Sequence, residues 1–154
     1  MSEKPLTLRR YSAADEDAAI ALWRRTWAVA YPDIDFDARL AWWRKRWQDE
    51  MTPTADIVVA EAPDGMIGFV TIDPKTGYLD QLVVAPEAWG GGVAGRLMDE
   101  AKRIAPGVLF LYVNRDNARA VRFYTKHGFA VTDNSVNPLS GRPTFLMRWN
   151  RAAS

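Results

Sequence analysis

The stretch that decides the fold is Leu82–Leu97, LVVAPEAWGGGVAGRL. It predicts an apolar strand ended by Pro86, three consecutive glycines at 90–92, and a helix from Val93. Glycine reaches backbone angles that a side chain hinders, and a helix that opens after such a loop leaves main-chain N–H groups unpaired. These groups lie at the positive end of the helix dipole, so they predict a site for phosphate or diphosphate. The alternative is a tight turn where a strand packs closely against a helix.

The composition is that of a globular protein, and we expect one domain over residues 1–154. Apolar residues make up 48% of the chain and charged residues 25%, with no internal repeat or linker to divide it. Neither a signal peptide nor a long apolar run occurs in the sequence. We therefore expect a cytoplasmic protein without a membrane segment.

The charge balance limits the expected partners. Lys and Arg number 20 and Asp and Glu number 19, which gives a net charge of +1. Without a basic stripe, neither nucleic acid nor a membrane surface is an expected partner. The chain has no cysteine and one histidine, which argues against a thiolate or histidine-rich metal site and against a cysteine nucleophile. We therefore expect no metal.

The first third of the chain predicts one strand and two helices. Apolar and polar residues alternate over 6–11, which is typical of a strand. The first helix is expected between Ser12 and Pro32, and the pattern of the second breaks at Thr52–Thr54, around a proline. The apolar residues of the second helix recur with helical spacing: Phe36, Leu40, Trp43 and Trp47.

The remaining elements complete a mixed α/β domain. Strands are expected over 56–62, 66–72, 78–84, 108–113, 129–132 and 144–149. Short turns join the first three of these, which predicts an antiparallel meander. The glycine loop and its helix separate the third from the fourth, so these two strands can lie parallel. With a helix between Asn117 and Gly128, the predicted order is β-α-α-β-β-β-α-β-α-β-β.

Two motifs carry a resemblance to a known family. The loop at 89–94, WGGGVA, matches the two small residues that end the pattern Gln/Arg-x-x-Gly-x-Gly/Ala, and it departs from that pattern at Trp89. Downstream, residues 117–124, NARAVRFY, followed by Gly128 and Phe129, match Asn-x-x-Ala-x-x-Phe-Tyr…Gly-Phe. In this order the two motifs resemble those of the GNAT acyltransferase superfamily, over nearly the whole chain.

The resemblance implies a GNAT fold, with a splayed fourth and fifth strand, and acetyl-CoA as cofactor. Its diphosphate would rest on the main-chain amides of the loop, and its pantetheine arm would pair with the edge of the fourth strand. An amide at Val83 or Val84 would polarise the acyl carbonyl. The expected cofactor-binding residues are Leu82, Val83, Val84, Gly90, Gly91, Gly92, Val93, Ala94, Gly95 and Asn117.

The implied reaction is transfer of an acetyl group to a primary amine. We expect it to proceed by direct attack in a ternary complex, and the absence of a cysteine for an acyl-enzyme agrees with this. Tyr124 is the candidate acid that protonates the departing thiolate, and the alternative is an aromatic core residue. Asp80, which by period two shares a strand face with Tyr78 and Leu82, is the candidate base. Its alternative role is a structural bond to a turn or an arginine.

The acceptor side is expected at the first two helices, which commonly line it in this family. Trp27 and Tyr31 are therefore the candidate substrate-binding residues, since aromatic faces suit a cationic amine. The alternative is that these rings belong to the core. We expect a small-molecule amine, or else a peptide amine, as acceptor, and a monomer or homodimer.

Two other functions stay open at this point. Gly90, Gly92 and Gly95 also spell Gly-x-Gly-x-x-Gly, with Asp116 about twenty residues further on, which is the pattern of a Rossmann dinucleotide site. The hairpins predicted upstream argue against it, because that fold needs β-α-β units. A non-catalytic module that binds acyl-CoA is the second alternative.

Overall fold

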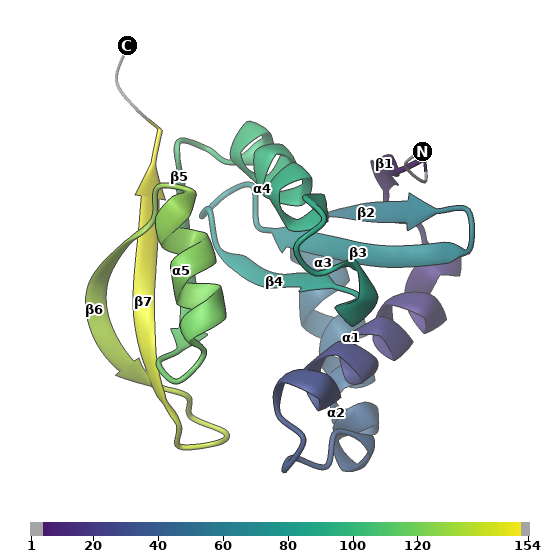
Figure 1. Cartoon of the computed structure of the whole chain (residues 1–154), viewed down its shortest axis with the longest axis horizontal. Coiled ribbons are helices and arrows are strands. Elements are labelled where there is room, and N and C mark those ends of the chain that lie inside the picture. Colours follow the sequence, from purple (N-terminus) through teal and green to yellow (C-terminus); the bar gives the residue numbers. More distant parts are fainter. Residues whose placement is uncertain (1–4, 152–154) are drawn as a thin grey trace.

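The computed structural model describes residues 5–151 and contains two β-sheets (Figure 1). The first has the strand order β1-β2-β3-β4, with every pairing antiparallel. Its strands are β1 (Thr7–Arg10), β2 (Asp56–Ala62), β3 (Gly65–Ile72) and β4 (Leu79–Val84). The expected antiparallel meander is therefore confirmed, and it excludes the Rossmann alternative, which needs parallel β-α-β units.

The second sheet places β7 (Pro143–Asn150) between β5 (Val108–Asn114) and β6 (Ala130–Val136), again with antiparallel pairing. Helix α5 (Ala118–Lys126) lies against this sheet, on the side toward α4 (Val93–Ile104) (Figure 1). The amine of Lys102 in α4 donates to the carbonyl of His127, just after α5, at 2.6 Å. The predicted order of strands and helices is confirmed.

Helices cover both faces of the first sheet. On one face, α4 packs with Val58 and Ala60 of β2. On the other, α1 (Glu16–Ala30) and α2 (Leu40–Arg46) pack with Ile57 and Val59. This alternation along one strand is what a sheet buried on both faces requires. On this second face the core is a tryptophan cluster of Trp23, Trp43 and Trp47, in which the Trp23 and Trp43 rings stack with centroids 4.5 Å apart.

The second helical segment runs further than the sequence predicts. After α2 it continues as a π-helical turn, Trp47–Met51, and a last short helix α3 (Thr52–Thr54), so the expected break at Thr52–Thr54 is wrong. A proline ring disturbs the helical bond to the residue four positions earlier, and a wider turn accommodates it. Within residues 5–151, no helix has the length and apolar character that a membrane crossing needs.

Strands β4 and β5 meet at one end and separate beyond it, as the splayed arrangement requires. Among residues 5–151 their one bridge is a parallel pairing of Tyr78 with Phe110. There the Phe110 N–H donates to the carbonyl of Gly77 at 3.0 Å, and the two aromatic rings stack at 5.1 Å. A Cβ on Gly77 would lie 2.2 Å from the Val108 carbonyl oxygen, so this closed end needs glycine. Toward Val84 the strands have no bridge, which leaves an open end.

Candidate functional site

The glycine loop lies between β4 and α4, where the sequence predicts it. A 3₁₀ turn, Pro86–Ala88, follows the strand, and Gly90 and Gly92 have φ angles of +82° and +87°. Residues with side chains rarely adopt these angles. A Cβ built on either glycine would meet no heavy atom within 4 Å. The outer surface of the loop is therefore open to a ligand.

Most main-chain donors of this loop have no acceptor in the protein. Over residues 5–151, no hydrogen bond is formed by the N–H groups of Gly90, Gly92, Val93, Ala94 and Gly95. The Gly91 N–H instead donates to the Ala88 carbonyl at 3.2 Å, so Gly91 shapes the loop without offering a donor. The dipole of α4 adds partial positive charge at the same place. This arrangement has the chemistry of an anion site.

The edge of β4 that faces the gap carries main-chain groups of Leu82 and Val84. The Ala85 N–H donates to β3 at 2.8 Å, and successive residues of a strand face opposite ways, so Val83 also bonds toward β3. Leu82 and Val84 therefore direct their groups into the gap. The Val84 carbonyl accepts a hydrogen bond from Nε1 of Trp89 at 2.7 Å. Of the three strand residues expected to hold pantetheine, Val83 thus offers no main-chain group.

Tyr124 lies on α5 among aromatic neighbours. Its ring centroid is 5.4 Å from that of Phe123 and 5.6 Å from that of Phe129. Burial raises the pKa of Tyr124 above its usual value, so the phenol keeps its proton at neutral pH. Over residues 5–151, its hydroxyl has no hydrogen-bond partner. This proton is available to a ligand.

Asn117 forms the N-cap of α5. Its side-chain oxygen accepts a hydrogen bond from the Ala120 N–H at 3.1 Å. The cap fixes the start of the helix, and Tyr124 then follows on the same side. One lone pair of the Asn117 oxygen is used in this cap, and its amide nitrogen has no hydrogen-bond partner over residues 5–151.

Asp80 is paired with an arginine from α2. It therefore makes the kind of structural bond that was the alternative to a role as base. Its two oxygens accept from the guanidinium of Arg46, one of them at 3.2 Å, and both side chains are largely buried. The expected common face with Leu82 is wrong. Leu79 and Leu82 both pack on the α4 side, and an irregularity in the pairing with β3 between them turns Asp80 toward α2.

Tyr31, at the end of α1, is bonded to residues at the end of β5, near the open end of β4 and β5. Its hydroxyl accepts from Asn114 at 2.9 Å and donates to Asp116 at 3.0 Å. Arg142, on the loop before β7, contacts the other carboxylate oxygen of Asp116 at 3.2 Å and lies 5.0 Å from the centre of the Tyr31 ring. Trp27 stacks on Tyr31 with centroids 5.7 Å apart, so the two expected acceptor residues do lie together.

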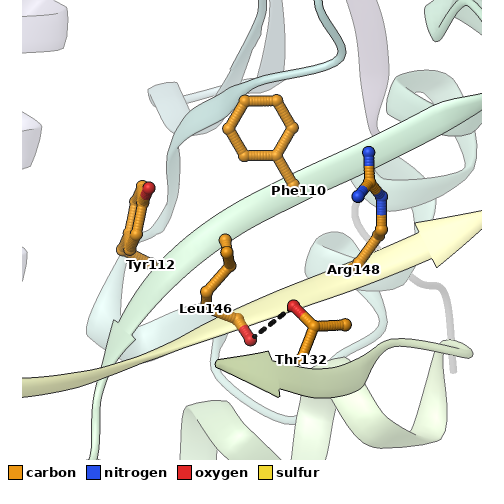
Figure 2. A pocket seen from close by; sticks show the side chains of 5 residues that line it. All are labelled: Phe110, Tyr112, Thr132, Leu146 and Arg148. Atoms are coloured by element: carbon orange, nitrogen blue, oxygen red, sulfur yellow. Dashed lines mark hydrogen bonds between the residues drawn. The ribbon is translucent and has the colours of Figure 1, made fainter. Parts of the chain in front are cut away.

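A shallow hollow of about 200 Å³ lies on the second sheet, beside the closed end of the strands (Figure 2). Its lining residues are Phe110, Tyr112, Thr132, Leu146 and Arg148. Figure 2 shows them on three neighbouring strands, with the Thr132 hydroxyl bonded to the Leu146 carbonyl at 3.3 Å. Sequence reasoning did not single out this hollow, because its residues come together through strand pairing alone.

Two further contacts were not expected, one at the glycine loop and one at the start of β4. The guanidinium carbon of Arg119, on α5, lies 4.1 Å from the centre of the Trp89 ring. Arg46, which holds Asp80, belongs to the helix of the tryptophan cluster. The sequence shows that Trp89 departs from the family pattern, but nothing local indicates its contact with Arg119.

Comparisons with known proteins give the family. The model of the acetyltransferase (GNAT) family matches residues 16–129, which include the loop, α4 and α5. This chain therefore belongs to the GNAT family of acetyltransferases, as the resemblance implied. As a member of this family it is an acyltransferase that uses acetyl-CoA as acyl donor. The free loop donors and the open strand edge are consistent with that cofactor.

Among proteins of known sequence, the chain is similar to peptidyl-lysine N-acetyltransferase YjaB. It is 30% identical to the Escherichia coli K12 protein over 143 residues, which cover 92% of this chain and 94% of that protein. It is 29% identical to the protein of the same name from Salmonella typhimurium LT2, over 92% and 95%. A shorter similarity, 36% identity over 90 residues, links it to a mycothiol acetyltransferase from Kineococcus radiotolerans, covering 55% of this chain and 30% of that protein.

Solved structures share the architecture. The solution structure of apo-YjaB from Escherichia coli aligns with a TM-score of 0.68 and 29% identity, covering 96% of this chain and 99% of that one. PaiA N-acetyltransferase from Thermoplasma acidophilum, crystallised with coenzyme A, aligns with a TM-score of 0.76 and 23% identity, over 95% and 99%. The second likeness shows the fold alone. Together they confirm the expected fold class.

Proposed function

We propose that this chain, as one domain over residues 1–154, transfers an acetyl group from acetyl-CoA to a primary amine in a ternary complex. The proposal depends on one observation: main-chain N–H groups without an acceptor in the loop lie next to a strand, β4, whose edge toward β5 is open. Acetyl-CoA supplies the activated thioester. The loop N–H groups would meet the charge of its diphosphate, and Leu82 and Val84 would pair with its extended arm. The Val84 N–H is the candidate donor to the acyl oxygen.

We infer that Tyr124 donates a proton to the departing thiolate. Its hydroxyl has no partner over residues 5–151 and its pKa is raised by burial, so the neutral donor form is the one present. The ion pair with Arg46 argues against Asp80 as the direct base, because the amine would have to displace the guanidinium to reach the carboxylate oxygens. We therefore propose a positioning role for Asp80, which holds α2 against β4, with loss of the amine proton to water.

For the acceptor we propose the side-chain amine of a peptide lysine. The similarity to peptidyl-lysine N-acetyltransferases extends over more than nine-tenths of this chain and supports this choice. Trp27 is the ring proposed to meet an ammonium group, because Tyr31, which stacks on it, already has the Arg142 guanidinium over its own ring. A small-molecule amine is the second candidate, and the partial similarity to a mycothiol acetyltransferase favours it.

The test is release of free coenzyme A thiol from acetyl-CoA in the presence of pooled lysine peptides, matched acetyl-lysine peptides, and pooled small amines. We expect release with lysine peptides and none with peptides whose lysine is already acetylated. Release with small amines alone would reassign the acceptor. Binding of acetyl-CoA without release across all pools would instead indicate a non-catalytic acyl-CoA-binding module.

A further inference from the structure

Trp89, the residue just before the three glycines of the loop, has its side chain fixed by a hydrogen bond within the protein. Trp89 stands where the GNAT pattern has glutamine or arginine, and its indole N–H donates to the Val84 carbonyl at 2.7 Å. An indole has one donor and no charge, and here that donor is used within the protein. Trp89 therefore cannot supply the polar contact that glutamine or arginine would offer an anion at this place.

A cation from another element lies on the Trp89 ring. The guanidinium carbon of Arg119 is 4.1 Å from the ring centre, in the range of a cation–π contact. Arg119 is in the first turn of α5 and is exposed to solvent. Over residues 5–151, no carboxylate forms an ion pair with it. Its positive charge is thus held next to the loop without being neutralised.

We propose that Arg119 binds the diphosphate of acetyl-CoA and that the Trp89 ring holds its guanidinium in place to do so. A guanidinium stacked by one face on a ring keeps its N–H groups free at its edge, and these match two phosphate oxygens. The free loop N–H groups approach the same anion from Gly92 and its neighbours. The charge missing from position 89 is supplied from α5. This inference rests on the proposed function.

The test measures the dissociation constant of coenzyme A by calorimetry for wild type, Arg119→Gln and Arg122→Gln. Arg122 is the matched control, because it is an exposed arginine of the same helix without a bond or ring contact over residues 5–151. We expect Arg119→Gln to weaken binding by about 10- to 100-fold, the effect of losing charge-assisted hydrogen bonds. Arg122→Gln should stay within about twofold.

Two further arms test which phosphate Arg119 binds and whether a cation at the loop is what binding needs. Arg119→Gln should weaken the binding of 3′-dephospho-coenzyme A by the same factor as that of coenzyme A. If it weakens the binding of coenzyme A alone, Arg119 contacts the 3′-phosphate, and the proposal is overturned. Trp89→Arg in the Arg119→Gln background should restore binding, because it returns a cation to the loop. Unchanged binding by Arg119→Gln, in a protein that still releases thiol, would refute this inference alone. A wild-type protein that binds no coenzyme A would refute the proposed function as well.

Discussion

The hydroxyl of Tyr31 donates a hydrogen bond to Asp116 at 3.0 Å, although the two residues lie 85 positions apart. This bond ties the end of α1 to the loop between β5 and α5, near the open end of the strands. We predict that Tyr31→Phe raises KM for the amine about 2- to 10-fold, the range of a lost hydrogen bond, with a smaller change in kcat. Tyr112→Phe, at a hydroxyl without a bond over residues 5–151, is the control. Equal KM for all three proteins would contradict a role for this contact.

Tyr124→Phe tests the proton donor. We predict a fall in kcat of at least about 100-fold with coenzyme A affinity unchanged, because the hydroxyl acts in the transition state. Burial raises the pKa of Tyr124, so deprotonation of this group should not reduce kcat between about pH 7 and 10. A descending limb in that window, absent from the Phe variant, would contradict the assignment, as would equal turnover.

Gly92→Glu tests the loop. A glutamate at φ +87° strains the backbone and places a negative charge where the diphosphate is expected. We predict loss of measurable coenzyme A binding by calorimetry. Gly141→Glu is the matched control, since Gly141 also has positive φ, +72°, with open space around it. If both variants bind equally well, the loop does not hold the diphosphate.

Asp80 and Arg46 are predicted to act as one unit in stability. Removing either partner leaves the other charge largely buried, so Asp80→Asn and Arg46→Gln should each lower the free energy of unfolding by about 2–4 kcal/mol. The double variant should cost less than the sum of the two, by about 1–3 kcal/mol, in chemical denaturation. Strict additivity would mean that the ion pair does not form in solution.

Asp15 gives a pH-dependent prediction. Hydrogen bonds from the Arg9 guanidinium lower its pKa to about 2, below the value near 3.9 of an unfolded chain. A lowered folded-state pKa adds stability above the unfolded pKa, and this stability is lost as the pH falls through the folded value. The Tm of Asp15→Asn should therefore lie below that of the wild type by its full amount at pH 6, and this difference in Tm should shrink between about pH 4 and 2. A deficit constant across that range would contradict the ion pair.

Local patterns were enough to predict most of the fold. Strand alternation, the turns around Gly65 and Gly77, and the glycine loop before Val93 are encoded by neighbouring residues. The helical segment was expected to break at Pro53. It continues because the π-helical turn before the proline accommodates its ring. The face of Asp80 was missed for a similar reason, since one irregularity in strand pairing reverses the period-two pattern beyond it.

The contacts of the site depend on residues far apart in the sequence. Arg119 and Trp89 meet because α5 packs beside the loop, and Arg46 reaches Asp80 because α2 crosses the sheet. No periodicity encodes these meetings. The motifs nevertheless placed Tyr124 and Asn117 on one helix, since a cap and a seven-residue spacing are local properties.

Amide hydrogen exchange with and without saturating coenzyme A tests the central claim most directly. We predict slowed exchange at the loop amides, Gly90 and Gly92–Gly95, and at Val84, while Val83, already bonded within the sheet, is unchanged. Protection elsewhere, with these amides exchanging as fast as in the free protein, would contradict the claim that the loop and the strand edge hold the acyl donor.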